Sequence, residues 1–262
     1  MIEKMTRFII ITSGKGGVGK TTTAINLGTA LTSFGRDVLV LDGNLKTPNV
    51  GLYLGAPVVP VSLHDVIKGK KGIKEAAYLH PSGLKVIPGS ITLDDLKKPD
   101  YNTLKDLLKD LIGTTEVVII DSSPALGKDA LTLLRAADEA IVVTNPELPA
   151  VTEALKTIKM AERMGTRIAG VVVTRYRGDN IDINPQNVEE ILEKPVIGII
   201  PEDDTIRKAV RMKHPVTFSH PNSSASIGYK KLAANLLGEK YEENLLKRDG
   251  FFSYMLKVFG LR

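Results

Sequence analysis

The chain has 262 residues, of which 43% are hydrophobic and 25% charged, a balance typical of a globular protein rather than a disordered one. It contains no cysteine, which excludes disulfides, thiolate zinc sites, cysteine-ligated iron–sulfur clusters and a cysteine nucleophile. Its 35 lysines and arginines stand against 30 acidic residues, so the net charge of +5 permits an anionic partner without requiring one.

Short apolar runs recur along the chain and predict strands. They are uninterrupted and rich in β-branched residues, which is typical of strands buried on both faces of a parallel sheet. None approaches the roughly 18 apolar residues of a transmembrane helix, and the first leads directly into a glycine-rich loop, unlike a signal peptide. We therefore expect a cytoplasmic protein. The runs cover residues 8–12, 38–41, 117–120, 140–143, 169–173 and 196–200.

Segments with helical character alternate with these runs. The first is followed by Gly35, a common left-handed stop after a helix. Strands separated by helical segments of roughly 10–20 residues indicate βαβ units. The sequence thus predicts an α/β fold with a single doubly wound, mostly parallel sheet and helices on both faces. The expected helices cover residues 21–34, 101–111, 125–137, 149–164 and 203–212, and residues 43–60 and 175–186 are expected to be loops.

A phosphate-binding loop follows the first strand. Residues 14–21 satisfy the pattern G-x-x-x-x-G-K-[ST] between a predicted strand and a predicted helix. Glycines let backbone N–H groups surround phosphate oxygens, and the helix N-terminus adds partial positive charge. Lys20 can reach the β- and γ-phosphates, and the Thr21 hydroxyl can ligate Mg²⁺. The residues expected to bind a nucleoside triphosphate are Gly14, Lys15, Gly16, Gly17, Val18, Gly19, Lys20, Thr21 and Thr22.

Two predicted strands end in a carboxylate, one in Asp42 and the other in Asp121. A single aspartate in such a place often only caps the following turn. However, ligands of open α/β sheets lie at the carboxyl ends of the strands, where the phosphate loop also lies. We therefore expect both carboxylates to face the nucleotide.

The loop sequence G-K-G-G-V-G-K-T-T, residues 14–22, resembles the deviant Walker A motif of the MinD/ParA family of ATPases. The resemblance implies an ATP-dependent homodimer in which Lys15 contacts the phosphates bound by the partner subunit while Lys20 acts in cis. A solvated loop lysine is the alternative for Lys15. Residues 42–49 resemble the family's switch I and residues 119–125 its Walker B motif and switch II. The resemblance implies ATP hydrolysis with Mg²⁺, with Asp42 aligning the attacking water and Asp121 holding the metal's water shell.

The chain departs from the family at Asn44, where bacterial members usually carry a second acid. The absence of an N-K-x-D sequence favours adenine over guanine. Two segments resemble those that flank the adenine in the family, although simple turn chemistry is an alternative for each. The residues concerned are Thr174, Arg175, Pro201, Glu202 and Asp203.

The C-terminus resembles the MinD branch of the family. We expect an ATPase domain over residues 1–237, a charged linker over 238–250 and an amphipathic helix over 251–262. Such a helix, with a basic excess around it, suits the surface of an anionic membrane, and so predicts peripheral attachment to the cytoplasmic face of the cell membrane. Packing of this helix on the core or on a protein is the alternative. Its apolar stripe consists of Phe251, Phe252, Met255, Leu256, Val258 and Phe259.

The resemblance therefore implies a switch that dimerises on ATP, binds the membrane and positions cell-division or related machinery, with a protein effector that the sequence does not identify. The alternative is a ParA-type partitioning ATPase that binds non-specific DNA. Its support is a basic cluster at one predicted helix, made of Arg207, Lys208, Arg211 and Lys213. A solvated helix face explains that cluster better, because no aromatic residues lie among the charges.

Overall fold

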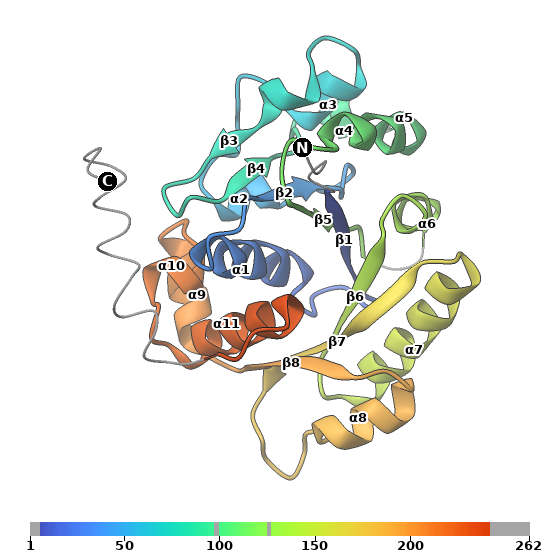
Figure 1. Ribbon diagram of the computed structural model, residues 1–262, viewed down its shortest axis with the longest axis vertical. Coiled ribbons are helices and arrows are strands. Elements are labelled where there is room, and N and C mark those ends of the chain that lie inside the picture. Colours follow the sequence, from blue (N-terminus) through green and yellow to red (C-terminus); the bar gives the residue numbers. More distant parts are fainter. Residues whose placement is uncertain (1–5, 97–99, 125–126, 242–262) are drawn as a thin grey trace.

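The computed structural model describes residues 6–96, 100–124 and 127–241. At its centre lies one eight-stranded sheet with the order β3-β4-β2-β5-β1-β6-β7-β8 (Figure 1). Neighbouring strands are parallel except for β3 and β4. The prediction of a mostly parallel sheet is confirmed. The strands are β1 (Arg7–Thr12), β2 (Val38–Asp42), β3 (Tyr78–Leu79), β4 (Lys85–Ile87), β5 (Val117–Asp121), β6 (Glu139–Thr144), β7 (Arg167–Tyr176) and β8 (Val196–Pro201).

The central strands are apolar on both faces because helices cover both. Successive side chains of a strand point to opposite faces, and β1 shows this division. Ile9 and Ile11 belong to the cluster beneath one helix layer, whereas Phe8 and Ile10 belong to the cluster beneath the other. This explains why the sequence shows uninterrupted apolar runs instead of an alternation with polar residues.

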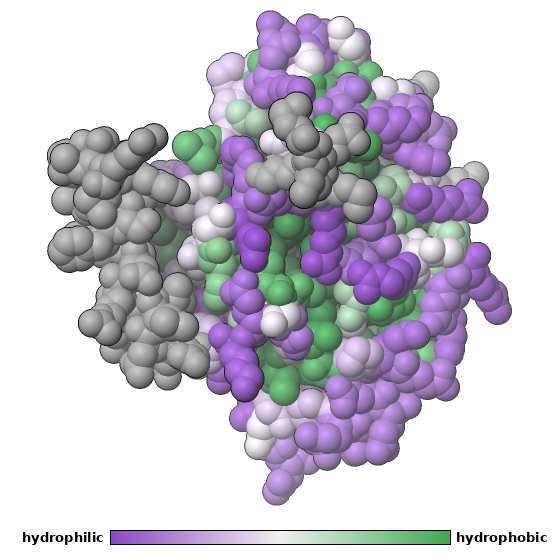
Figure 2. Space-filling view, in the orientation of Figure 1, coloured by the Kyte–Doolittle hydropathy of each residue, from purple (hydrophilic) through white to green (hydrophobic). Residues whose placement is uncertain are grey.

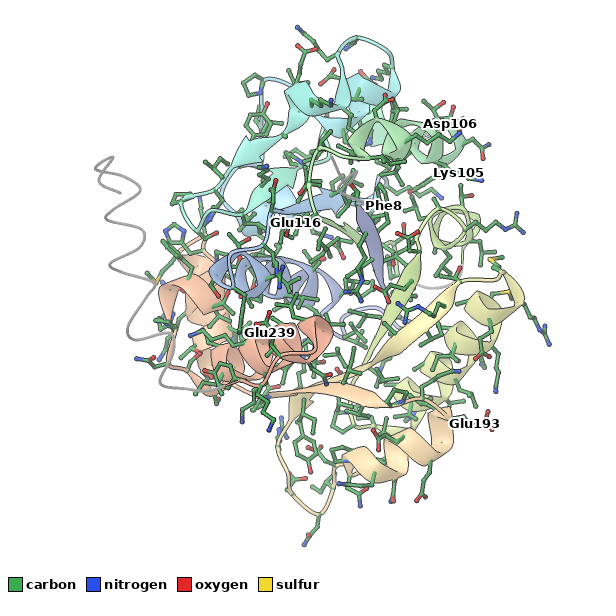
Figure 3. All side chains as sticks on the ribbon, viewed as in Figure 1. Phe8, Lys105, Asp106, Glu116, Glu193 and Glu239 are labelled. Carbon is green, nitrogen blue, oxygen red and sulfur yellow. The ribbon has the colours of Figure 1, made fainter. Side chains whose placement is uncertain are left out.

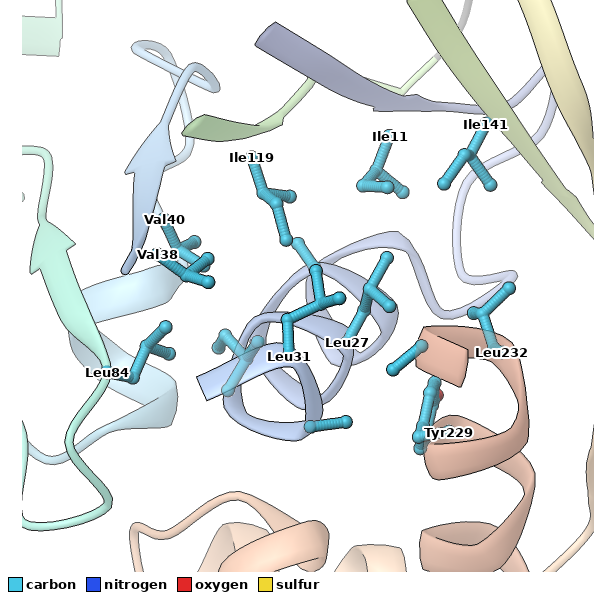
Figure 4. Close-up of a cluster of buried hydrophobic side chains, with 14 of the residues drawn as sticks. Ile11, Leu27, Leu31, Val38, Val40, Leu84, Ile119, Ile141, Tyr229 and Leu232 are labelled. Atoms are coloured by element: carbon cyan, nitrogen blue, oxygen red, sulfur yellow. The ribbon is translucent and has the colours of Figure 1, made fainter. Parts of the chain in front are cut away.

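The first helix layer contains α1 and α11, whose apolar side chains meet one face of the sheet (Figure 4). Helices α2, α9 and α10 contribute side chains to the same apolar cluster. The opposite face is covered by α3, α5, α6, α7 and α8. The helices are α1 (Lys20–Ser33), α2 (Val50–Tyr53), α3 (Leu63–Ile67), η1 (Ile73–Ala76), α4 (Leu93–Leu96), α5 (Tyr101–Leu107), η2 (Leu108–Leu111), α6 (Lys128–Leu134), α7 (Leu148–Arg163), α8 (Pro185–Leu192), α9 (Asp204–Arg211), α10 (Val216–Ser219) and α11 (Ser224–Leu237).

The expected strands and helices all occur, with ends shifted by a few residues. The edge strand β3 and its neighbour β4 have only two and three residues, too few for a recognisable pattern. The segment expected to be a loop over residues 43–60 contains the short helix α2. Helices α3, α4, α8, α10 and α11 were also not predicted. Within the described ranges, no helix combines the length and apolar character needed to cross a bilayer. The predicted membrane helix over 251–262, and the linker before it after Tyr241, lie outside the described residues.

Candidate functional site

The predicted phosphate loop connects β1 to α1 at the carboxyl edge of the sheet. Gly17 and Gly19 adopt positive φ angles of 77° and 94°, which residues with a side chain rarely adopt. A Cβ at Gly17 would meet nothing within 4 Å, so the space over the loop is open. The loop ends at the N-terminus of α1, whose first turn contains no acidic residue. The helix dipole therefore acts on this space with no carboxylate from the helix's own first turn to offset it.

Lys20 is folded into the loop and not extended into solvent. Its side chain is buried, and Nζ donates a hydrogen bond of 2.9 Å to Ser13 Oγ. Burial lowers the pKa of Lys20, and the attraction of Asp121 opposes that shift. The ammonium group is thus a buried cation in a loop of backbone N–H groups, an arrangement that favours an anionic ligand.

Thr21 and Asp121 meet beside Lys20. The Thr21 hydroxyl donates a hydrogen bond of 2.6 Å to Asp121 Oδ2. The other carboxylate oxygen, Oδ1, is buried and has no hydrogen-bond partner within the described part of the chain. A hydroxyl and a carboxylate are the oxygen ligands that Mg²⁺ uses in phosphate-binding proteins, and an unpartnered buried oxygen is costly without a ligand. These residues fit a magnesium ion.

Two more buried oxygens near this point lack a partner within the described residues, Thr12 Oγ1 and Ser123 Oγ. Thr12 ends β1, and Ser123 follows β5, the strand that pairs with it. Unpartnered buried polar atoms are rare in native proteins and are concentrated at sites that bind ligands. Their position therefore supports a polar ligand at this edge of the sheet.

Asp42 lies opposite Asp121, because the two residues pair in register on β2 and β5. Its fully buried carboxylate accepts hydrogen bonds from the backbone N–H groups of Asn49 and Val50, both at 2.9 Å, and of Asn44 at 3.3 Å. It therefore holds the start of α2 in this structure, as a capping aspartate does. The structure places it beside Asp121 at the edge that carries the phosphate loop, whereas its role toward the nucleotide and water stays a prediction.

The two carboxylates disfavour each other's ionisation. Burial, together with the negative charge of Asp121, raises the pKa of Asp42 to about 8, although its three backbone donors oppose the shift. Burial also raises the pKa of Asp121 to about 6, against the Thr21 hydroxyl and the charge of Lys20. A divalent cation between these groups would remove this repulsion.

Asn44 organises the loop after β2. Its amide nitrogen donates to the carbonyl and the hydroxyl of Thr47 at 2.7 and 2.8 Å, and its side chain is 5% exposed. A carboxylate there could not donate to the Thr47 carbonyl. The asparagine that departs from the family pattern thus has a local structural role and adds no third charge beside Asp42 and Asp121.

Lys15 extends from the loop toward Glu147, which caps α7, with Nζ 3.6 Å from a carboxylate oxygen. The two side chains are 47% and 59% exposed. An ion pair so exposed contributes little to stability, on the order of 0–1 kcal/mol. Lys15 is therefore able to leave this contact when a stronger anion is in reach.

The residues predicted to surround the adenine differ in their positions and contacts. Thr174 lies under the loop, and its buried hydroxyl donates to the Val18 carbonyl at 2.7 Å. Arg175 is exposed at a bulge of β7, with a positive φ of 56°. Strained residues of this kind are frequent at binding sites. Pro201 ends β8, and exposed Glu202 follows it.

Asp203 is the cap of two helices. Its carboxylate accepts hydrogen bonds from Thr205 in α9 and from Ser224 and Ala225 in α11. Burial raises its pKa, but these hydrogen bonds outweigh burial and hold the pKa well below the usual range. All of its contacts in the described residues are structural, so direct contact with a base stays a prediction.

Two residues outside the set predicted to bind ligands also organise the site. Ser13 receives the Lys20 hydrogen bond, and Asn145 Oδ1 accepts the Thr174 hydroxyl at 2.9 Å. Ser13 directly precedes the glycine motif, so its position was a usable signal. Asn145 lies far from the loop in sequence, and only the order of the strands brings it there.

A phosphate loop at a helix N-terminus, with two aspartates on neighbouring parallel strands, defines a P-loop nucleotide-binding protein. The sequence profile of the CobQ/CobB/MinD/ParA nucleotide binding domain matches residues 9–216. The chain therefore belongs to this family, which confirms the resemblance inferred from the loop and the prediction of a nucleotide site.

Known proteins agree with this assignment. An uncharacterised ATP-binding protein of Methanocaldococcus jannaschii is 40% identical over the full length of both chains. The structure of the septum site-determining protein MinD of Pyrococcus horikoshii, complexed with Mg-ADP, is 33% identical, with a TM-score of 0.84 over 94% of this chain and 99% of that one. MinD in the MinC:MinD complex of Aquifex aeolicus is 27% identical, with a TM-score of 0.81 over 90% of this chain and 97% of that one.

Proposed function

We propose that the chain is a MinD-like ATPase switch. In this proposal it dimerises on ATP, binds the inner surface of the cell membrane through residues 251–262, positions cell-division or related machinery, and is released by hydrolysis. The observation that carries the proposal is the Thr21–Asp121 hydrogen bond with its unpartnered Asp121 oxygen, placed beside buried Lys20 and opposite Asp42.

ATP and Mg²⁺ are the proposed ligands. Lys20 and the loop N–H groups would bind the phosphates, and Thr21 with Asp121 would hold the metal. Mg²⁺ supplies positive charge that stabilises the negative charge of the transferring phosphoryl group. Asp42, with its raised pKa, is suited to hold a proton or to orient a water molecule at this edge. The Mg-ADP in the related P. horikoshii protein supports this choice of ligands.

The proposed dimer uses Lys15. Its exposed contact with Glu147 is weak, whereas a triphosphate bound by a second copy offers several negative charges. Transfer of Lys15 from Glu147 to the partner's phosphates would couple dimerisation to the presence of ATP. A protein that recognises the dimer would then act as effector, and the MinC:MinD complex of the A. aeolicus relative supports a partner of this kind.

The proposed membrane contact lies in the segment that follows the described residues. Phe252 belongs to the apolar stripe of the expected helix, and Ser253 lies on its polar side. One copy of so short a helix binds weakly. Two copies on one rigid dimer raise the avidity by roughly 10² or more, so ATP would control attachment through the dimer.

The test is sedimentation of the full chain with vesicles of phosphatidylglycerol and phosphatidylcholine, with Mg-ATP or Mg-ADP. We expect binding with ATP only, and no binding after deletion of residues 251–262 or with Phe252→Glu. Ser253→Glu is the matched control, because it adds the same charge on the polar side and is expected to keep most of the binding. Sedimentation of the truncated protein, or none by the full chain, would refute the membrane contact.

A parallel arm measures ATP-dependent retention on non-specific duplex DNA at increasing salt. Retention that requires ATP and falls steeply with salt, without vesicle binding, would favour the partitioning ATPase instead. ATP hydrolysis measured in the same samples separates the two parts of the proposal, since the nucleotide site does not depend on the surface that the dimer binds.

A further inference from the structure

A cavity of about 660 Å³ lies at the amino-terminal edge of the sheet. Arg7 begins β1 at this edge, and the other end of the same strand leads into the phosphate loop. At about 3.3 Å per residue, the six-residue strand places the cavity roughly 17 Å or more from the loop. The cavity is therefore separate from the nucleotide site.

The floor of this cavity is apolar. Phe8, Leu108, Ile112 and Ala136 line it, from β1, from η2 and the residue after it, and from the chain that follows α6. Ile112 is 59% exposed, although it is a large aliphatic side chain. On the face shown in Figure 2, hydrophobic surface lies between hydrophilic side chains. Phe8 and Leu108 are buried, so an apolar ligand in this cavity would cover mainly the exposed side chain of Ile112.

The rim of the cavity is cationic. Five cationic and two anionic side chains line it. Lys105 extends from α5, close to the strand that carries Phe8 (Figure 3), and Arg135 follows α6. Both are exposed, and neither forms an ion pair or side-chain hydrogen bond within residues 6–96, 100–124 and 127–241. Two cations that form no ion pair in this part of the chain therefore stand on different elements around one apolar floor.

A buried carboxylate holds two arginines of the rim in place. The carboxylate of Glu139 is fully buried and forms ion pairs with Arg7 and with Arg167. Arg7 also donates to the Leu236 carbonyl at 3.4 Å. A guanidinium has five N–H donors, so both arginines keep donors that this buried carboxylate does not use. The side chain of Arg167 is 68% exposed and offers them to solvent.

We propose that this cavity binds a small organic anion that carries an apolar body. Its volume lies within the range of small-molecule sites, roughly 300–1,000 Å³. The apolar body would cover Phe8 and Ile112, and a carboxylate, sulfonate or phosphate group would pair with Lys105, Arg135 and the preorganised arginines. Occupation of this site is independent of the phosphate loop.

The probe for the test is 8-anilinonaphthalene-1-sulfonate, an aromatic anion whose fluorescence rises in apolar surroundings. The full chain is titrated with this probe with and without saturating Mg-ADP. We expect saturable binding of one probe per chain, unaffected by Mg-ADP and weakened at high salt. In the double variant Lys105→Glu/Arg135→Glu we expect the dissociation constant to rise by about tenfold or more, because two attractions become repulsions.

The matched control is Lys208→Glu/Arg211→Glu, which makes the same change in net charge at exposed positions of α9. It is expected to bind the probe as the unmodified chain does. Thermal unfolding of both variants shows whether they keep the native fold. Absence of saturable binding, displacement of the probe by Mg-ADP, or equal affinity of the folded double variant would overturn the proposal. None of these results depends on ATP hydrolysis or membrane binding.

Discussion

We expect Asp42→Asn to change how the free energy of unfolding depends on pH. The amide oxygen of asparagine can accept the two N–H groups of Asn49 and Val50 that Asp42 accepts at 2.9 Å. Only the longer contact with the Asn44 N–H, at 3.3 Å, is lost. The substitution therefore keeps most of the local hydrogen bonding and removes the group that would ionise beside Asp121.

The magnitude follows from the raised pKa. An aspartate in an unfolded chain has a pKa of about 3.9, whereas Asp42 in the folded protein has a pKa of about 8. Between these values the unfolded chain loses the proton and the folded protein keeps it. Asp42 thus contributes stability that is fully present below pH 4 and is lost as the pH rises to 8. Each pH unit in this window removes about 1.4 kcal/mol, so the step from pH 5 to pH 7 removes about 2–3 kcal/mol.

The assay is urea unfolding of the nucleotide-free protein at pH 5, 6, 7 and 8. Relative to the unmodified chain, Asp42→Asn is expected to gain about 2–3 kcal/mol of stability between pH 5 and pH 7. Asp110→Asn is the matched control at an exposed position, and its difference from the unmodified chain is expected to stay nearly constant. Saturating Mg-ADP should reduce the effect of Asp42→Asn, since a bound cation offsets the repulsion between the carboxylates.

A pH-independent difference between Asp42→Asn and the unmodified chain would refute this reasoning. It would mean that the three backbone donors outweigh burial and the charge of Asp121, so that Asp42 is ionised at all these pH values. A loss of stability of several kcal/mol at every pH would instead show that the aspartate is needed as a structural acceptor.

Single substitutions elsewhere separate nucleotide binding, dimerisation, metal binding and packing. Lys20→Ala is expected to abolish ATP binding in calorimetry, and unchanged affinity would contradict its assignment. Lys15→Ala should bind ATP yet remain monomeric in light scattering; normal dimerisation and hydrolysis would refute transfer to the partner subunit. Thr21→Val keeps the shape of the side chain but removes its hydroxyl. The affinity for ADP, measured by calorimetry with Mg²⁺ and with EDTA, should then depend much less on Mg²⁺. An unchanged dependence on Mg²⁺ would exclude Thr21 as a ligand. Ile10→Ala empties a fully buried position and should lower the free energy of unfolding by about 2–5 kcal/mol in urea, whereas a loss below about 1 kcal/mol would contradict tight packing there.

Features encoded within one element and its neighbours could be predicted from the sequence. The phosphate loop is a contiguous motif, because a strand, a glycine turn and a helix N-terminus must follow one another to surround a phosphate. The apolar runs determined the α/β class, since strands covered by helices on both faces have no polar side. The ends of β2 and β5 placed Asp42 and Asp121 at the same edge.

Which of these groups are in contact depends instead on how the strands and helices pack together. Asp42 lies opposite Asp121 because β2 pairs with β5, although the two residues are far apart in sequence. Thr174 lies under the loop and Asp203 caps two helices, because burial forces each polar group to take the partners that packing brings near. The cavity at the amino-terminal edge of the sheet likewise combines side chains from four separate parts of the chain. Local patterns follow from the period of a helix or strand, whereas these contacts depend on strand order, which joins residues that no short segment contains.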